Sequence, residues 1–259
     1  MTPLAPGPVA DTPAADRATE RRVALVTGAT RGIGFEIARQ LGHHGLVVLV
    51  GARDRERGEA AVRRLTAEAV DAELVPLDVT SEASIAAAAA AVSSRFDRLD
   101  VLVNNAGILL DRGLKPSEVS PALLHATYDT NVFGPIAVIQ AFLPLLRRSP
   151  AGRIVNASSE LASLARNTDP AFEFAHLKRL AYNSSKTALN AVTVLFAHEL
   201  RDTPIKVNAA DPGYTATEFN AYAGTQSVEE GARAAVALAL LPDDGPTGGY
   251  FNADGPLPW

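Results

Sequence analysis

The sequence predicts an α/β fold built on one parallel sheet with helices on both of its faces. Short runs rich in β-branched residues alternate along the chain with longer segments of helical periodicity. Most of these short runs are apolar at both alternating positions, which is typical of strands covered by helices on each side. Counting the runs predicts a doubly wound sheet of seven parallel strands.

The elements follow in a regular order. The expected strands are the segments VALVTG, LVVLVGAR, AELVPLDV, LDVLVNNAG, GRIVNASS, IKVNAADPG and GYFNADG. The expected helices cover residues 32–43, 54–69, 81–95, 118–148, 180–201 and 227–240. Ser227 followed by Glu230 predicts a capping box at the start of the last helix. No internal repeat interrupts this order, so residues 21–259 are expected to form one domain.

The composition excludes several classes of protein. With 47% hydrophobic and 20% charged residues among 259, the chain is not expected to be disordered. A net charge of −5 provides no basic field for a nucleic acid. The lack of cysteine excludes disulfides and Cys-ligated metals and favours a reducing cytoplasm, and the five histidines show no metal-binding spacing.

Residues 1–20 are rich in proline and alanine and predict a flexible tail. They lack the basic start and apolar run of a secretory signal. Charged residues or prolines interrupt every apolar stretch before it is long enough to cross a bilayer. Neither a membrane span nor a membrane partner is therefore expected.

A glycine-rich turn follows the first expected strand, where residues 27–34 read TGATRGIG. Glycines allow a tight turn, and the helix that opens behind them presents free N–H groups to an anion such as a pyrophosphate. The spacing Gly-x-x-x-Gly-x-Gly differs from the G-x-G-x-x-G dinucleotide fingerprint. An ordinary strand-to-helix turn is the alternative interpretation.

A tyrosine and a lysine form a candidate proton-transfer pair. Tyr182 and Lys186 are four residues apart in a helical pattern, which places their Cβ atoms about 5–6 Å apart on one face. An adjacent ammonium stabilises a phenolate, and lowering the pKa of the tyrosine by about three units needs about 4 kcal/mol. The pair can therefore move a proton in the neutral pH range.

Five motifs in one order resemble the short-chain dehydrogenase/reductase family. They are TGxxxGxG at 27–34, NNAG at 104–107, a serine after the strand at 153–157, Tyr182-x-x-x-Lys186 and Pro212-Gly213. The likeness covers about residues 22–252. The segment SVEEGARAAVALALLPDDGPTGGYF and the closing Trp259 are most similar to the carbonyl-reductase group. The resemblance implies a single-domain Rossmann fold and a nicotinamide cofactor.

The resemblance also implies the residues of the site. The catalytic set is Asn131, Ser159, Tyr182 and Lys186. The cofactor-binding set is Gly28, Thr30, Arg31, Gly32, Ile33, Gly34, Arg53, Asp78, Val79, Asn104, Ala106, Gly107, Tyr182, Lys186, Pro212, Gly213, Thr215 and Thr217. Ser158 is the alternative to Ser159, because either hydroxyl can cap a helix or bind backbone. Asp78 would bind the adenine, and a helix-capping role is its alternative.

Two arginines favour NADP(H) over NAD. The 2′-phosphate of NADP requires a cation, whereas NAD sites commonly place a carboxylate on the ribose. Arg31 lies inside the glycine loop, and Arg53 follows the second strand, where Ala52 stands at the position that often holds the carboxylate. The alternative is that both arginines are solvated surface charges.

A proline within the helix expected over 118–148 frees a carbonyl group. Pro135 has no N–H, so the carbonyl of Asn131 loses its intrahelical donor and the helix should bend there. We expect this carbonyl to hold a water in a proton relay with Lys186, the role the family implies for Asn131. The alternative is a bend that only wraps the helix around the core.

The segment between Ser159 and Tyr182 predicts a wall of the substrate pocket. Asp169 and Pro170 predict the start of a short helix that carries Phe172, Phe174 and Leu177. Other apolar residues expected at the pocket are Leu109, Leu110, Tyr214, Phe219 and Tyr222, and Arg112 and Lys115 are candidate ligands for an acidic group. The pocket should suit a neutral ketone or aldehyde, and the protein should be a monomer or small homo-oligomer.

The function predicted is NADPH-dependent reduction of a ketone or aldehyde to an alcohol. Tyr182 would donate the proton while the cofactor delivers hydride. One alternative keeps the fold and cofactor but acts on an imine, or as a cyclase or epimerase. An alternative of another class is a binding protein that senses NADP(H), against which the intact catalytic set argues.

Overall fold

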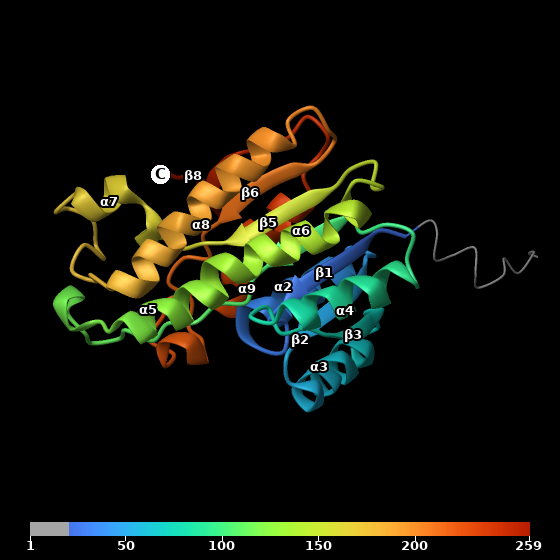
Figure 1. Cartoon of the computed structure of the whole chain (residues 1–259), viewed down its shortest axis with the longest axis horizontal. Helices are drawn as coiled ribbons and strands as arrows, with labels where there is room; N and C mark the ends of the chain where they lie inside the picture. Colours follow the sequence, from blue (N-terminus) through green and yellow to red (C-terminus); the bar gives the residue numbers. More distant parts are fainter. Residues whose placement is uncertain (1–20) are drawn as a thin grey trace, which may run out of the picture.

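The computed structural model describes residues 21–259, so the tail expected over residues 1–20 lies outside the described residues. Within the described part, one sheet has the strand order β3-β2-β1-β4-β5-β6-β7-β8 (Figure 1). The strands are β1 Val23–Thr27, β2 Val47–Ala52, β3 Ala72–Pro76, β4 Val101–Asn104, β5 Arg153–Ala157, β6 Lys206–Ala210, β7 Tyr250–Asn252 and β8 Gly255–Pro256. The seven parallel strands are confirmed, and the two-residue β8 adds an antiparallel partner to β7.

Helices cover both faces of this sheet. They are α2 Gly32–His43, α3 Arg55–Ala67, α4 Glu82–Ser93, α5 Pro121–Tyr128, α6 Gly134–Leu146, α7 Leu164–Thr168, α8 Leu180–Glu199 and α9 Val228–Ala239. Short 3-10 segments are η1 Pro116–Glu118, η3 Glu160–Ala162 and η4 Glu218–Asn220. Helices α4, α6 and α8 lie on one face, in front of the strands in Figure 1, and α2, α3 and α9 lie on the other. The capping box of Ser227 and Glu230 at α9 is confirmed.

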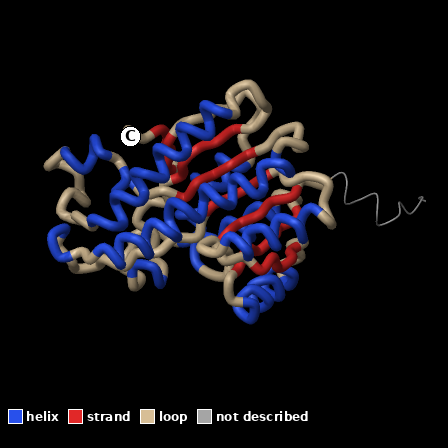
Figure 2. The backbone as a smooth tube through the Cα atoms, in the orientation of Figure 1, coloured by secondary structure: helices blue, strands red, loops and turns tan. Residues whose placement is uncertain are grey.

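The central strand shows why the sequence is apolar at consecutive positions. Ala24 and Val26 of β1 pack in the core on the side of α2 and α9, whereas Val23 and Leu25 pack in the core on the other side. From β1 the chain builds outward to β2 and β3, then returns to β4 on the opposite side of β1. Ligands of such sheets bind at the carboxyl edge, at this switch point. Figure 2 shows the loops and short helices gathered beyond one end of the sheet.

The helix predicted over 118–148 is interrupted. Helices α5 and α6 are joined by a π-helical turn, η2 Asp129–Phe133, in which the Gly134 N–H donates to the Asp129 carbonyl. Pro135, which has no N–H to donate, follows at the start of α6. Gly134 has no room for a side chain, because a Cβ there would lie 2.9 Å from the Val79 carbonyl oxygen. The sequence located the irregularity but not its π-helical form.

The segment from Pro121 to Leu146 is apolar enough, over its length, to meet the compositional test for a membrane span. Half of its most apolar 18-residue stretch is buried within the fold. Val138, Ile139 and Phe142 are fully buried in the core that faces the sheet. We therefore assign this segment to the protein core.

The helix predicted at Asp169 and Pro170 is wrong. Residues 169–179 form turns and irregular backbone, and the short helix α7 precedes them. The Asp169 carboxylate accepts from the Ala171 N–H at 2.8 Å, which makes a turn rather than a helix cap. The apolar residues expected there nevertheless cluster, since Phe172 packs with Leu161 and Tyr182, and Phe174 and Leu177 pack against them.

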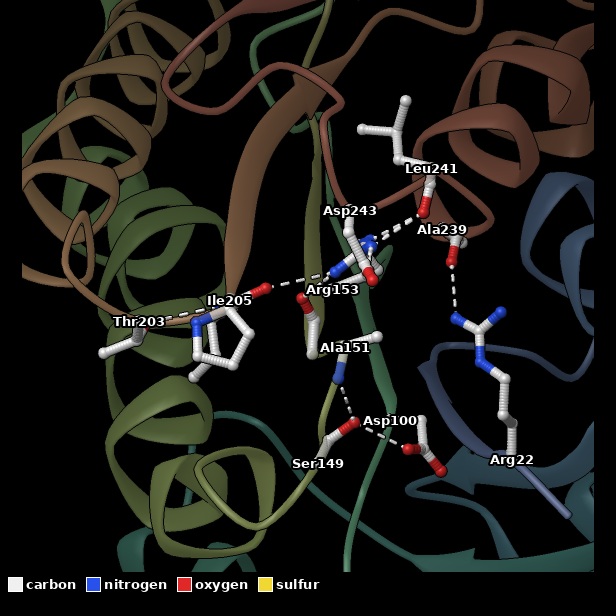
Figure 3. Close-up of polar contacts among 12 residues, drawn as sticks. Arg22, Asp100, Ser149, Ala151, Arg153, Thr203, Ile205, Ala239, Leu241 and Asp243 are labelled. Atoms are coloured by element: carbon white, nitrogen blue, oxygen red, sulfur yellow. Dashed lines mark hydrogen bonds and ion pairs between the residues drawn. The ribbon is translucent and has the colours of Figure 1, made fainter. Parts of the chain in front are cut away.

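The amino edge of the sheet is closed by a buried arginine (Figure 3). Arg153, 1% exposed, donates to the Leu241 carbonyl at 2.8 and 3.0 Å and pairs with Asp243 at 3.0 Å. Nearby, the buried Asp100 accepts from the Val23 N–H at 2.8 Å and the Ser149 hydroxyl at 2.6 Å. The buried polar groups at the amino edge are thus hydrogen-bonded to one another and stabilise the fold there.

Candidate active site

A cavity of about 990 Å³ follows the carboxyl edge of the sheet. The glycine loop, the ends of β2 and β3, the serine loop after β5, helix α8 and the loop after β6 all contribute to its lining. It is lined by every residue of the predicted catalytic and cofactor-binding sets except Asn104 and Asn131. The resemblance therefore predicted most of one continuous site.

The glycine loop meets the conditions for holding a pyrophosphate. Gly28 and Gly32 have φ of +65° and +55°, which side chains rarely adopt. A Cβ on Gly34 would lie 2.3 Å from the Asn105 Nδ2 and 2.5 Å from the Gly28 carbonyl oxygen. No side chain caps the N-terminus of α2, so its N–H groups face the cavity without a side-chain partner.

The NNAG motif contributes through a neighbour of the predicted residue. The Asn104 side chain is buried away from the cavity and donates to the Asn156 Oδ1 at 2.9 Å. Asn105 lines the cavity instead, and its Nδ2 donates to the carbonyls of Thr27 and Gly28 at 2.9 and 3.2 Å. Asn105 thus fixes the glycine loop to β4, which the sequence did not reveal.

The expected adenosine end of the cavity contains an arginine and an aspartate. Arg53 lines it and makes no hydrogen bond or ion pair with any residue in 21–259. Asp78 accepts from the N–H and hydroxyl of Thr80 at 2.9 and 2.7 Å. Burial would raise the pKa of Asp78, but these bonds and the charge of Arg53 outweigh it, so the pKa lies below its usual value. Ser81 caps α4, so Asp78 is not the helix cap.

The second predicted phosphate cation is already paired. Arg31 lines the cavity at the glycine loop and forms an ion pair with Glu218 of η4. Both side chains are more than half exposed, which makes such a pair weak in water. An incoming phosphate can therefore compete with Glu218 for Arg31.

Ser159, Tyr182 and Lys186 come together at the other part of the cavity. The Ser159 hydroxyl interacts with the Tyr182 phenol and favours a lower pKa of that phenol. The Lys186 Nζ lies 5.9 Å from the centroid of the Tyr182 ring and donates to the Ala157 carbonyl at 2.6 Å. The Ser158 hydroxyl donates instead to the Asn190 Oδ1 at 2.6 Å. The geometry therefore favours Ser159 over Ser158 as the partner of Tyr182.

Burial controls the charge of this pair. It raises the pKa of Tyr182 to about 12, despite the opposing hydrogen bond of Ser159 and charge of Arg179. It also lowers the pKa of Lys186 to about 8. The sequence predicted a phenol made more acidic by Lys186, whereas in the structure burial raises the pKa of the phenol and Lys186 is not among the groups that lower it. Tyr182 therefore holds its proton firmly.

Asn131 acts on the loop that follows β4 rather than on the cavity. Its Oδ1 accepts from the Ile108 N–H at 2.9 Å, and its Nδ2 donates to the Ile108 carbonyl at 2.9 Å and the Ser185 hydroxyl at 3.0 Å. Fully buried, it connects the π-helical turn, this loop and α8. A Cβ added to Gly107 would lie 3.5 Å from both the Asn131 Oδ1 and the Lys186 Nζ.

Two buried aspartates at the site were not predicted. Asp111 is fully buried, and its Oδ2 accepts from the N–H groups of Ala181 and Tyr182 at 2.7 and 3.4 Å, so it caps α8 from a distant loop. Asp211 is 3% exposed and accepts from the Glu160 N–H at 2.9 Å, next to Ser159. Burial raises the pKa of Asp211 to about 6.

The substrate end of the cavity is mainly apolar. Its lining includes Leu109, Leu161, Phe174, Leu177, Tyr214, Phe219 and Tyr222. Leu110, expected there, is 47% exposed and lies outside the lining. Arg112 donates to the Phe219 carbonyl at 2.5 Å and Lys115 starts η1, so neither lines the cavity. Arg179, which the sequence did not single out, does.

A doubly wound sheet whose cavity joins a glycine loop to a Ser–Tyr–Lys cluster defines a nucleotide-dependent oxidoreductase of the Rossmann type. The family model for short chain dehydrogenase matches residues 22–227. The chain belongs to the short-chain dehydrogenase family. Among residues 21–259, no group of three His, Cys, Asp or Glu side chains is placed to hold a metal ion.

Known proteins similar to this chain are reductases and NADP complexes. (-)-Isopiperitenone reductase of Mentha piperita is 35% identical to this chain, and the alignment covers 90% of this chain and 97% of the reductase. The structure of NADPH-bound carbonyl reductase from chicken fatty liver matches with a TM-score of 0.80 at 30% identity, and the match covers 92% of this chain and 99% of that one. The structure of a metagenomic short-chain oxidoreductase in complex with NADP matches with a TM-score of 0.72 at 33% identity, and the match covers 89% of this chain and 95% of that one.

Replacing Asp111 tests its role as the cap of α8. Asp111→Ala leaves two buried N–H groups without an acceptor and is expected to lower the free energy of unfolding by about 1–3 kcal/mol. Asp111→Asn keeps an acceptor oxygen and should recover most of that loss in urea unfolding. Ser120→Ala, which removes the cap of α5, is the matched control and should cost about 1 kcal/mol. Equal destabilisation by Ala and Asn at position 111 would contradict the capping role.

The raised pKa of Asp211 makes stability depend on pH. The folded-state pKa of Asp211 is about 6, against an ordinary value of 3.8, so the stability that its protonated form contributes is complete below pH 4 and is lost as the pH rises through 6. Asp211→Asn keeps the acceptor but does not ionise. The variant should gain up to about 3 kcal/mol relative to the parent between pH 4 and pH 7 in urea unfolding. A difference that stays constant over this range would show that Asp211 does not titrate there.

Proposed function

We propose that the protein reduces a ketone or aldehyde to an alcohol with NADPH, as a reductase of the carbonyl-reductase type. The observation that carries the proposal is the contact of the Tyr182 phenol with the Ser159 hydroxyl, in the same cavity as the glycine loop. A protonated phenol and a second hydroxyl can both bind one carbonyl oxygen. The NADPH-bound carbonyl reductase among the similar structures supports the same chemistry.

The residues present fit a nicotinamide dinucleotide. Gly28, Gly32 and Gly34 make room for a pyrophosphate at the N-terminus of α2. Arg53 is available for the 2′-phosphate of NADP, and Asp78 lies beside it for the adenine. The NADP and NADPH complexes among similar structures support NADP(H) as the cofactor. When bound, the cofactor supplies the hydride that the carbonyl carbon accepts.

The chain supplies the proton and the orientation. Ser159 and Tyr182 hold the carbonyl oxygen, and the Tyr182 phenol donates its proton to that oxygen as the alcohol forms. The high pKa of Tyr182 before binding means that the donor is protonated at neutral pH. The Lys186 ammonium, one helical turn along, stabilises the phenolate that remains and positions the nicotinamide ribose.

The phenolate must then recover a proton. We expect the Asn131 carbonyl to hold a relay water, because the π-helical turn and Pro135 disturb the hydrogen bonding of this helix. The Asn131 Oδ1 and the Lys186 Nζ would each lie 3.5 Å from a Cβ added to Gly107, so both side chains lie beside the same loop residue, which supports a path between them. The relay would deliver a proton from solvent through Lys186 to Tyr182.

Substitutions of the two serines and the tyrosine test this assignment. Tyr182→Phe is expected to lower kcat for NADPH-dependent carbonyl reduction by at least about a thousandfold, because the proton donor is lost. Ser159→Ala should lower it about a hundredfold, as expected when one donor to the reacting oxygen is removed. Ser158→Ala should stay within about tenfold of the parent. NADPH absorbance at 340 nm is the measurement, and a larger loss for Ser158→Ala than for Ser159→Ala would reverse the assignment.

Cofactor selectivity should depend on Arg53. Arg53→Ala removes the unpaired cation and is expected to reduce the ratio of kcat/KM for NADPH over NADH by about 10- to 100-fold. Arg55→Ala is the matched control, since Arg55 is 79% exposed in its side chain and lies outside the cavity. An unchanged ratio in Arg53→Ala, or an equal change in Arg55→Ala, would place the 2′-phosphate elsewhere.

A further inference from the structure

The arginine and lysine side chains that line the cavity differ in whether they have partners. Most are engaged: Arg31 with Glu218, Arg39 with Glu36 and Glu68, Arg57 with Asp54, Arg64 over the Phe35 ring and Lys186 with the Ala157 carbonyl. Within residues 21–259, the guanidinium groups of Arg53 and Arg179 make no hydrogen bond or ion pair. Arg53 is accounted for by the cofactor. Arg179 is not.

Arg179 lies at the substrate end of the cavity. It is half-buried and immediately precedes α8, three residues before Tyr182. Phe174 and Leu177, close to it in the chain, also line this end. Arg179 and Tyr182 line the same cavity, and the charge of Arg179 opposes the rise that burial causes in the pKa of the Tyr182 phenol. The positive N-terminal end of α8 reinforces this charge.

The carboxylates at this end of the cavity already have other partners. Glu160 pairs with Arg166 at 2.7 Å, and Asp211 accepts from the Glu160 N–H. Asp111 caps α8. A half-buried guanidinium among aromatic side chains with no anion of its own is less stable than one with a partner. A bidentate carboxylate is the ligand that guanidinium geometry matches best.

We infer that Arg179 binds a carboxylate of the substrate, so that the substrate is an oxo acid with an apolar body. Its carbonyl lies at Ser159 and Tyr182, its apolar part contacts the wall formed by Leu161, Phe174 and Leu177, and its carboxylate meets Arg179. This inference rests on the proposed reductase function. It replaces the neutral substrate that the sequence predicted with an anionic one.

The test compares matched pairs of substrates with the full-length protein and NADPH. The probes are benzoylformate, 3-benzoylpropionate and 4-benzoylbutyrate, each beside its methyl ester. For at least one length, the acid is expected to exceed its ester in kcat/KM by about 10- to 100-fold, the effect of one charge-assisted pair. In Arg179→Met, which keeps the apolar volume, that ratio should fall to near one, and Arg179→Lys should keep part of it.

Lys178→Met is the matched control. Lys178 is an exposed neighbour whose Nζ donates to the Asn167 carbonyl, so the variant removes the same charge outside the cavity. Its ratio of acid to ester should equal that of the parent. Equal rates for all acids and esters in the parent, or equal losses in Arg179→Met and Lys178→Met, would overturn the inference.

A binding measurement separates this inference from the proposed reduction. Calorimetric titration of the protein with 4-phenylbutanoate and its primary amide, in the presence of NADP⁺, requires no turnover. The parent should bind the acid about tenfold or more tightly than the amide, and Arg179→Met should not discriminate. Tighter binding of the acid than of the amide, without reduction of any carbonyl substrate, would contradict the proposed function alone. Reduction of the esters without discrimination would sink only the role of Arg179.

Discussion

The site depends on the burial of two ionisable side chains one helical turn apart. Removal from water disfavours the charged form of each, so the pKa of the Tyr182 phenol rises to about 12 and that of the Lys186 ammonium falls to about 8. A buried phenol that keeps its proton suits an enzyme that must donate one. The arrangement of the surrounding groups decides where charge that develops in the cavity is stabilised.

Long-range contacts hold the pair in place. Asp111, from the loop after β4, supplies the acceptors that α8 lacks at its own N-terminus, and Asn131 connects the same loop to Ser185 within α8. Asp211 fixes the backbone beside Ser159. These polar groups are buried and engaged by backbone N–H groups, so each is costly to remove and each restricts the position of a reacting side chain. The geometry of the cluster is thus a property of three loops that converge on one helix.

The sequence predicted what local pattern determines. The seven strands and the bounds of α2 follow from periodicity and glycine placement, since both depend on neighbours in the chain. The sequence analysis assigned Asn104 to the cofactor site, whereas Asn105 lines the cavity. Adjacent side chains at a strand end point to opposite faces, so an error of one residue selects the wrong asparagine. The prediction of a helix at Asp169 was wrong because the same carboxylate can cap a helix or close a turn. Asp111 acts across 70 residues, so no local signal marks it.

The cavity arginines whose side chains have no partner within residues 21–259, Arg53 and Arg179, owe their positions to different parts of the fold. Arg53 follows β2, where the doubly wound topology places the far end of a dinucleotide, so its position is inherited from the sheet. Arg179 stands at the start of the catalytic helix, so its position is inherited from the segment between Ser159 and Tyr182, which the sheet does not constrain. That segment can vary in length and sequence without moving β5 or α8. With the roles that we propose for Arg53 and Arg179, cofactor choice and substrate choice would depend on separate parts of the chain, with Tyr182 between them.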